Sequence, residues 1–485
     1  MPSGQVIRVR REDDGVAAET LRDGIRQIQA ELKVTPEFPP EVQRAADAAA
    51  GAPRLPDVDR TDIPFVTLDP PGSMDLDQAF HLDRDGDGYT VRYAIADVAA
   101  FLEPGGPVDT EANLRGQSLY GADSKIPLHP KVLSEGSASL LPDQVRPALL
   151  WTMTLDAAGA VTSTHVERAR VRSVAKLDYA GVQQQLDEDS LTGPYADSVR
   201  LLRTIGELRI QQEIQRGGVS LPLPDQEVEI TGDRWRLAYR TLLPAEEWNA
   251  QLSLMTGYGA AKLMLGAGIG LLRTLPPADP RDTARFKRAT LALGVPWPEG
   301  MSYPDFLRSL DPTEPKHAAV LVASTRLLRG GGYLAFTGAP PEHAEHAALA
   351  SPYAHVTAPL RRLVDRYAGE ICVAVCAGEP VPSWVTERMP EVPDTMRRTA
   401  SLAGSYERAI LDLVEAGVLA PHVGERFDGV VIDLDDRDQG RGTVTVPEPA
   451  VEAPVSGPAP LPLGTDVSVR LTEADVAKRK VAFTL

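Results

Sequence analysis

Cysteine is almost absent from this sequence. Only two of its 485 residues are cysteines, Cys372 and Cys376, and they are spaced to share one face of a predicted helix. Two helical thiols without a neighbouring His or Cys make no zinc site, and two cysteines form no disulfide framework in a chain of this length. We therefore expect both thiols to pack in the core of a protein from a reducing compartment.

Long hydrophobic runs and a secretory leader are also missing. No stretch approaches the roughly 18 apolar residues needed to cross a bilayer. The N-terminus lacks the basic, apolar and small-residue zones of a signal peptide. We expect a cytoplasmic protein without membrane contacts.

The sequence has no excess of basic residues. Lys and Arg total 50 against 68 Asp and Glu, which gives a net charge of −18 at pH 7. This charge disfavours a general basic surface that binds nucleic acid by releasing counterions, and by itself it suits an acidic scaffold that binds protein. This argument against nucleic-acid binding weakens if the acids gather at a metal site and on outer surfaces while arginines line one internal groove.

The length predicts about three domains, each able to bury a core. We assign residues 1–58 to a small N-terminal module, helical or winged-helix-like, residues 59–420 to a large middle domain and residues 421–485 to a β-barrel. Alternating apolar residues predict strands at 6–10, 65–69, 79–82 and 89–99. Helical periodicity marks 16–32, 40–50, 198–215, 244–265, 315–328 and 359–377. The fold class is α+β.

The number and length of the strands predicted in the last domain are typical of a small OB-type barrel. Its predicted strands cover 428–434, 442–446, 466–471 and 480–485. Residues 447–464 are rich in Pro and Ala, so we expect a long loop there instead of a paired strand.

The sharpest local feature is residues 65–80, where three aspartates surround a Pro-Pro-Gly turn. Asp69 ends one strand, and an extended chain after the turn places Asp75 and Asp77 on one face. The opposite face is then apolar, with Met74, Leu76 and Phe80. Converging acids raise each other's pKa unless a cation offsets the repulsion, and oxygen ligands suit Mg²⁺, with Mn²⁺ as the alternative. The competing interpretation is a set of solvated turn acids.

Residues 67–79 resemble the catalytic signature of the RNase II/RNase R (RNB) exoribonuclease family. The resemblance continues through residues 93–98, 115–120 and 126–140 and covers most of residues 60–420. It implies an RNB catalytic domain with a mixed β core and surrounding helices. It also implies that Asp69 and Asp77 are catalytic metal ligands and that Asp75 is a catalytic metal ligand or an orienting acid.

A second cluster, residues 353–365, resembles the arginine motif of the same family. The resemblance makes Arg361 the catalytic arginine, a fork-shaped donor suited to a phosphoryl transition state. The alternative role is a salt bridge to Asp365, one helical turn on, and the two roles are compatible. Pro359 is expected at a helix start whose N–H groups receive a phosphate.

Other residues are assigned to RNA binding. Arg362 and Arg366 are expected to face solvent or the RNA backbone. His355 is expected to be a packed, hydrogen-bonded histidine and not a catalytic one. His355 and Thr357 are both candidates for contacts with RNA. The resemblance places Tyr179 where a ring stacks on a nucleotide, although core packing is an equal alternative. Residues 424–485 resemble the OB-fold RNA-binding domain of the ribosomal S-one type, and there Phe427 is the expected RNA contact.

The sequence departs from the family pattern at several positions. Gln78 stands where a fourth Asp is usual, so a neutral oxygen replaces an anionic metal ligand. The usual helix Glu would fall near Ala250 or Gln251, and Glu247 is a candidate substitute. Ala358 replaces a usual Ser.

The resemblance implies a monomeric, Mg²⁺-dependent enzyme that binds single-stranded RNA. Metal-activated water would hydrolyse the RNA processively from the 3′ end to 5′-nucleoside monophosphates. The alternative is a catalytically impaired RNA-binding protein that keeps the RNB channel.

Overall fold

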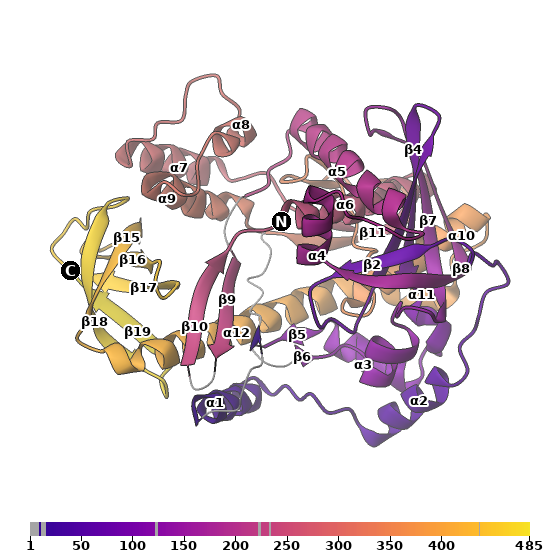
Figure 1. The fold of residues 1–485 in the computed structure, drawn as a ribbon, viewed down its shortest axis with the longest axis horizontal. Helices are drawn as coiled ribbons and strands as arrows, with labels where there is room; N and C mark the ends of the chain where they lie inside the picture. The colour runs from indigo at the N-terminus through magenta and orange to yellow at the C-terminus, as the bar shows by residue number, and fades with distance from the viewer. Residues whose placement is uncertain (1–8, 11–15, 122–124, 222–224, 232–233, 436) are drawn as a thin grey trace.

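Two β-barrels and a long connecting helix organise the molecule, which is a computed structural model (Figure 1). The helix is α12 (Val392–Leu419). The structure describes residues 9–10, 16–121, 125–221, 225–231, 234–435 and 437–485.

The first barrel is closed in the strand order β2-β3-β4-β7-β8. Neighbouring strands are antiparallel except β2 and β8, which are parallel. The strands are β2 (Phe65–Asp69), β3 (Gln78–Asp85), β4 (Gly88–Ala96), β7 (Val145–Leu155) and β8 (Val161–Asp178).

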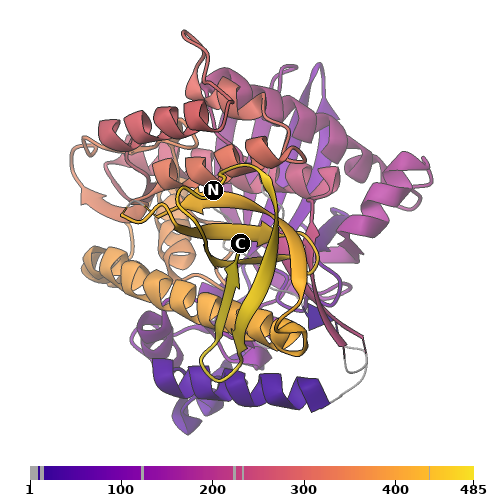
Figure 2. The same cartoon turned by 90° about the vertical axis from the view of Figure 1, so that its left-hand side faces the viewer.

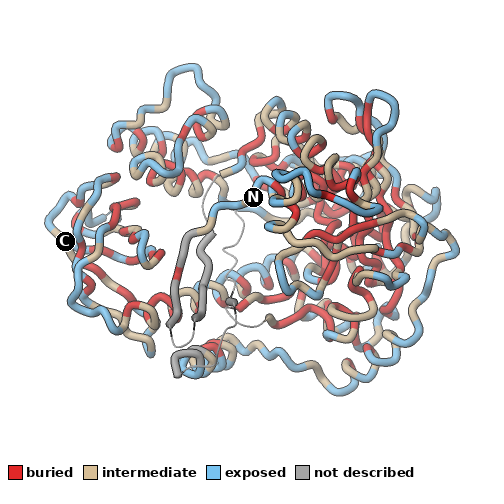
Figure 3. Tube along the Cα trace, viewed as in Figure 1, coloured by how far each residue is buried: buried red, intermediate tan, exposed pale blue. Residues whose placement is uncertain are grey.

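Both faces of this barrel are buried. On β4, Tyr93 and Ile95 belong to one apolar cluster, whereas Ala94 and Ala96 belong to another. Successive side chains of a strand point to opposite faces, so the large residues meet one layer of the protein and the alanines meet another. Figure 3 shows that buried residues concentrate in this part of the chain.

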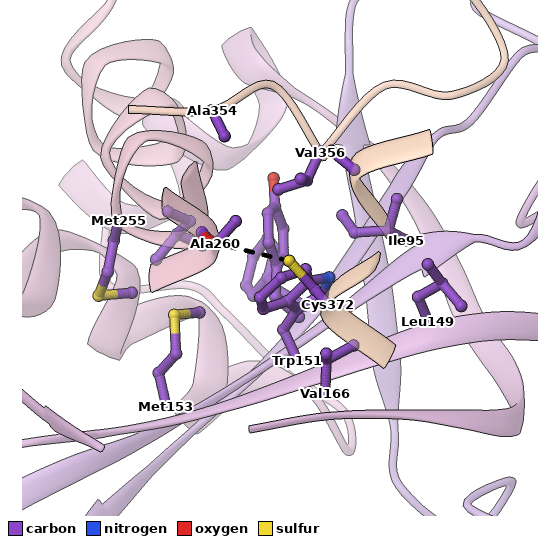
Figure 4. Packing of buried hydrophobic residues seen from close by; sticks show 14 of the residues in the cluster. Ile95, Leu149, Trp151, Met153, Val166, Met255, Ala260, Ala354, Val356 and Cys372 are labelled. Atoms are coloured by element: carbon purple, nitrogen blue, oxygen red, sulfur yellow. Dashed lines mark hydrogen bonds between the residues drawn. The ribbon is translucent and has the colours of Figure 1, made fainter. Parts of the chain in front are cut away.

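Helices surround the barrel and complete its core. They include α3 (Pro107–Arg115), α4 (Tyr179–Asp187), α5 (Ala196–Arg216), α6 (Pro244–Ala267), α10 (Leu363–Ala377) and α11 (Ser383–Arg388). Between α10 and α6, the Sγ of Cys372 lies 3.8 Å from the carbonyl oxygen of Ala260, near Trp151 (Figure 4). Cys372 is buried, Cys376 is partly buried, and both are free thiols. The interpretation of Cys372 as core packing is confirmed.

The C-terminal strands close a second barrel, in the order β15-β16-β17-β19-β18. They are β15 (Arg426–Leu434), β16 (Arg441–Val446), β17 (Val451–Ser456), β18 (Asp466–Asp475) and β19 (Lys480–Thr484). Figure 2 shows this barrel in front of α12, with which it shares an apolar cluster. The expected α+β class with a C-terminal OB-type barrel is confirmed.

The expected long loop at residues 447–464 is wrong, because β17 lies inside it. Val451, Ala453 and Val455 are buried and alternate with exposed residues, which is the period of a half-buried strand. Pro454 is tolerated because β17 pairs with β19 only from Val455 onward, so the missing N–H of the proline removes no bond on that side.

The N-terminal module is helical. Helices α1 (Val16–Leu32) and α2 (Pro40–Ala50) have the expected bounds, and α1 packs on α12 close to Gly24 and Leu413. Strand β1 (Val9–Arg10) pairs in parallel with β9 (Asp225–Thr231), which forms a hairpin with β10 (Arg234–Arg240). Residues 6–8 of the expected first strand lie outside the described residues.

The remaining strands and α-helices lie between β4 and β7 or between α6 and α10 along the chain. They are β5 (Leu119–Tyr120), β6 (Lys125–Ile126), β11 (Ile269–Thr274), α7 (Pro280–Ala292), α8 (Tyr303–Arg308), α9 (Pro315–Ser324), β12 (Gly332–Thr337), β13 (Glu345–His346) and β14 (Ser351–Pro352). None of the helices within the described ranges is long and apolar enough to span a membrane.

Candidate active site

A tight turn links the strands that carry the acidic motif. The N–H of Ser73 donates to the carbonyl of Pro70 at 3.2 Å, and Gly72 has a φ of +82°. This arrangement, with Pro at the second position and a positive φ at the third, is a type II turn, which favours glycine. The turn leads the chain from Asp69, at the end of β2, back toward β3.

The segment after the turn is anchored by Ser139. Its hydroxyl donates to the carbonyl of Met74 at 2.7 Å and accepts the N–H of Leu76 at 2.9 Å. Leu76 is fully buried, as expected, but 44% of Met74 is exposed, so the expected apolar face includes Leu76 and not Met74. These backbone contacts fix the chain on either side of Asp75.

Asp77 is the buried acid of the motif. Its Oδ1 accepts the N–H of Leu360 at 2.8 Å, and its Oδ2 lies 4.0 Å from the Nε of Arg361. Burial raises the pKa of this carboxyl well above its ordinary value, and Asp75 and Asp365 raise it further, while Arg361 and the Leu360 N–H oppose the shift. A cation at the free edge of Asp77 would offset this cost.

Asp75 turns toward a lysine. Its Oδ1 lies 2.8 Å from the Nζ of Lys125, which also lies 3.0 Å from the Oε1 of Glu135. Among the residues that the structure describes, no three His, Cys, Asp or Glu side chains form a group able to hold a metal ion. The expected convergence of Asp69, Asp75 and Asp77 at one ion is therefore not seen, because Asp75 is paired with Lys125.

Gln78 is held by a network of its own. Its Nε2 donates to the carbonyl of Thr357 at 2.7 Å, and its Oε1 accepts the hydroxyl of Tyr93 and, at 3.2 Å, that of Ser253. The Gln78 amide thus ties β3 to the arginine motif and to α6. Its role as a metal ligand stays a prediction, and it would require the oxygen to leave or share these donors.

The two adjacent arginines of the motif have different environments. The side chain of Arg361 is 43% exposed and lies beside Asp77. Arg362 instead makes two contacts of 2.8 Å with Asp365, which also accepts the N–H of Ala358 at 2.7 Å. The proposed pairing of Arg361 with Asp365 is therefore wrong, as is a solvent-facing Arg362. The pKa of Arg362 is raised by this carboxylate although burial opposes the shift.

The expected helix start at Pro359 is also wrong. Helix α10 begins at Leu363, whose N–H donates to the carbonyl of Gly116 at 2.9 Å, and Pro359 lies in the preceding turn. The N–H of Leu360 is already bonded to Asp77, so it is not free for a phosphate.

Arg366 differs from its expected exposed position. It is buried, and its guanidinium pairs with Asp109 and lies over the rings of Tyr367 and Trp384. It therefore belongs to the core beneath the motif.

The residues beside the first barrel that were expected to contact RNA are buried or partly buried. Tyr179 is partly buried at the start of α4, and its hydroxyl accepts a bond of 3.2 Å from Asn249. Thr357 is buried. His355 is buried too, with its Nδ1 2.7 Å from the hydroxyl of Tyr333. Burial, followed by nearby arginines, lowers the pKa of His355 well below its ordinary value, so the ring is neutral.

Phe427 lies in β15 of the second barrel. It is partly buried, and its ring meets those of His422 and Phe483 at centroid distances of 6.3 and 5.9 Å. Its contact with RNA stays a prediction.

The acid suggested as a substitute for the missing helix Glu is not among the side chains around Gln78. Glu247 is exposed, and the charges that raise its pKa, after burial, belong to Glu213 and Glu246. The α6 residues that contact site side chains are Asn249 and Ser253.

Sequence reasoning missed Lys125 and Tyr120 as site residues. They face each other across the β5–β6 pair. Burial raises the pKa of Tyr120, and the charges of Arg361, Asp75 and Lys125 all act on its hydroxyl. Tyr120 lies inside a segment that carried the family resemblance, which was a usable signal. Nothing local in the sequence marks Lys125.

Asp69 and Asp77 fit a hard divalent cation. Burial is the main cause of the raised pKa of Tyr93, and the charges of Asp69 and Asp77 both add to it. Mg²⁺ commonly binds through one or two carboxylates while keeping several waters. Asp75 is paired with Lys125 through its Oδ1.

Comparisons with known proteins match two families. Residues 58–376 match the RNB domain, and residues 425–485 match the RNase II-type exonuclease C-terminal S1 domain. The chain is 30% identical to Ribonuclease R of Escherichia coli over 324 residues, which are 64% of this chain and 39% of that protein. It spans 38 to 39% of the length of three of the curated relatives it matches.

Two solved structures share the fold. Mycoplasma genitalium RNase R in complex with ribose methylated single-stranded RNA has a TM-score of 0.84 and 18% identity, covering 96% of this chain and 78% of that one. Yeast Ssd1, a pseudonuclease, has a TM-score of 0.69 and 16% identity, covering 90% and 55%. At these identities the likeness concerns the fold alone. The RNB match covers more than half of the sequence and includes Asp69, Asp75, Asp77 and Arg361, and the chain therefore belongs to the RNB family and ends in an RNase II-type S1 domain.

Proposed function

We propose that this chain is a monomeric exoribonuclease that hydrolyses single-stranded RNA processively from its 3′ end to 5′-nucleoside monophosphates. Exoribonucleases of the RNB family generally depend on divalent metal ions, and we propose Mg²⁺ here. The observation that carries the proposal is the exposed Arg361 guanidinium beside the buried Asp77 carboxylate, with 4.0 Å between Nε and Oδ2.

Each site residue has a separate role in the proposed phosphodiester hydrolysis. Arg361 donates to the non-bridging oxygens of the scissile phosphate, where negative charge develops in the transition state. Asp77, fixed by the Leu360 N–H, and Asp69 would hold the divalent cation, and the bound cation would supply Lewis-acid stabilisation of the charge that develops at the phosphate. Tyr179 orients the terminal nucleotide by stacking on its base.

The direct test is incubation of the purified chain with 5′-labelled single-stranded RNA and Mg²⁺. The proposal expects the full-length RNA to give way to a short 5′-labelled end product without accumulation of intermediate lengths, and unlabelled nucleoside 5′-monophosphates to appear in a chromatogram of the same reaction. A matched duplex and an EDTA-treated sample serve as controls. Internal cuts, or 3′-phosphate products, would contradict the proposed reaction.

The second candidate is an RNA-binding protein with impaired chemistry. Gln78 in place of an acid and Asp75 paired with Lys125 favour this alternative, because both reduce the carboxylates available to a cation. Fluorescence-anisotropy titration with single-stranded oligo(A) and its duplex separates the candidates. Tight single-strand binding without hydrolysis supports the impaired protein, whereas no RNA binding favours an acidic scaffold.

The missing acid at position 78 leads to a testable expectation. Gln78→Asp should lower the Mg²⁺ concentration needed for half-maximal activity, because a carboxylate near Asp77 strengthens the attraction for a divalent cation. The shorter side chain also loses the bond to the Thr357 carbonyl, which should cost about 1 to 3 kcal/mol of stability without metal. Mg²⁺ titrations of activity and thermal unfolding measure both effects.

Gln78→Asn is the matched control, because it shortens the side chain equally without adding charge. A metal requirement in Gln78→Asp that equals or exceeds that of Gln78→Asn would contradict the missing-ligand explanation.

The second barrel is expected to add affinity through Phe427. Phe427→Leu keeps an apolar side chain against Phe483 but removes the aromatic face, so binding of oligo(A) should weaken by about 1 to 3 kcal/mol, the usual value of one stacked base. Anisotropy titration measures the loss. Val423→Ala, at an exposed residue, is the control. Unchanged affinity in Phe427→Leu would show that Phe427 is not part of the RNA-binding surface.

A further inference from the structure

A lysine reaches into the acidic motif from a separate hairpin. Strands β5 and β6 pair Tyr120 with Lys125, and the Nζ of Lys125 lies 2.8 Å from Asp75 and 3.0 Å from Glu135. The side chains of all three charged residues are only 19 to 22% exposed. An ion pair this sheltered from solvent is screened less than one on the surface.

The lysine changes the charge that the motif offers to a metal. Asp75 is neutralised by a residue of the chain itself, and the Gln78 oxygen already accepts two hydroxyl donors. Asp69 and Asp77 are the acids of the motif that remain. Glu135 also pairs with the ammonium, at 3.0 Å.

We propose that Lys125 is a positioning residue that acts as a fixed cation in the active site. It neutralises Asp75 in the manner of a metal ion and leaves the divalent cation to Asp69 and Asp77. The inference deepens the proposed function, on which it rests for the role of the divalent cation. It predicts that the chain holds fewer divalent ions than its carboxylates would otherwise support.

The test is a titration of the metal-free full chain with Mn²⁺, followed by isothermal calorimetry and by the Mn²⁺ electron paramagnetic resonance signal. Lys125→Met removes the charge but keeps much of the side-chain length. It should bind Mn²⁺ roughly tenfold more tightly, or bind an additional ion, because one neighbouring opposite charge typically shifts a carboxylate's affinity for a cation by tenfold or more. Lys125→Arg keeps the charge and should bind Mn²⁺ like the wild type.

Two further measurements separate this role from a purely structural one. Lys131→Met, at an exposed lysine of the following segment, controls for a general loss of positive charge. Thermal unfolding without metal should show Lys125→Met destabilised, with Mn²⁺ restoring more stability than it adds to the wild type.

Equal Mn²⁺ affinity and stoichiometry in the wild type and Lys125→Met would overturn the proposal, as would an Arg variant that behaves like the Met variant. If Lys125→Met does not fold, Lys125→Gln decides: a neutral amide also removes the charge beside Asp75, so Mn²⁺ binding should tighten as well, and unchanged binding would overturn the proposal. None of these readouts requires RNA hydrolysis, so failure of the proposed function would appear separately, in the labelled-RNA assay.

Discussion

Asp77→Asn is expected to lower the rate of RNA hydrolysis by about two or more orders of magnitude, the scale of losing one preorganised charge at a reacting phosphate. The reason is the position of the carboxylate, which is buried, fixed by the Leu360 N–H and 4.0 Å from Arg361. An Asn at this position still accepts the Leu360 N–H but brings no charge to a cation. Single-turnover hydrolysis of labelled RNA measures the effect.

RNA binding and folding should survive this substitution. The pKa of Asp77 is raised mainly by burial, so a neutral amide removes the cost of a buried charge and should leave the metal-free protein at least as stable. Asp83→Asn, at a partly exposed carboxylate further along β3, is the control and should retain full activity. Hydrolysis by Asp77→Asn at a rate near that of the wild type would refute the assigned role of Asp77.

Much of the fold follows from local sequence patterns. Helices α1 and α2 and strand β2 have the predicted bounds, because amphipathic periodicity and flanking breakers mark them clearly. Strands β7 and β8 were not predicted, although they complete the first barrel. Only seven of the 18 residues of β8 are apolar, and they are irregularly spaced, so its own sequence marks a strand weakly and its pairing with β2 and β7 decides its conformation.

The candidate site was predictable only in part. The positions of Asp69 and Asp77 follow from the turn and the strand that flank them, and the family resemblance identified Arg361. The partners of these residues depend on contacts between distant segments: Leu360 lies 283 positions from Asp77, and Thr357 lies 279 from Gln78. A helix start four residues later than expected moved Arg361 off the helix, which is why Asp365 pairs with Arg362 instead.

The same substitution, Arg to Gln, is expected to have opposite effects at the two neighbouring arginines. Arg361→Gln is expected to lower hydrolysis by about 100- to 1000-fold, the usual effect of removing one transition-state donor, with little change in stability because 43% of the side chain is exposed. Arg362→Gln should instead destabilise the protein by about 3 to 5 kcal/mol, because it leaves the buried Asp365 carboxylate without its cation.

Thermal unfolding and single-turnover kinetics, measured on both variants, test this assignment. If Arg361 is the catalytic arginine, its variant unfolds like the wild type but is slow at every RNA concentration, since the lost contact acts on the transition state. The folded fraction of Arg362→Gln should keep a substantial rate at temperatures well below its lowered midpoint. The reverse pattern, a stable but inactive Arg362→Gln beside an active Arg361→Gln, would move the phosphate contact to Arg362. It would also imply that substrate binding breaks the pair with Asp365, freeing that carboxylate while the N–H of Ala358 still holds it in place.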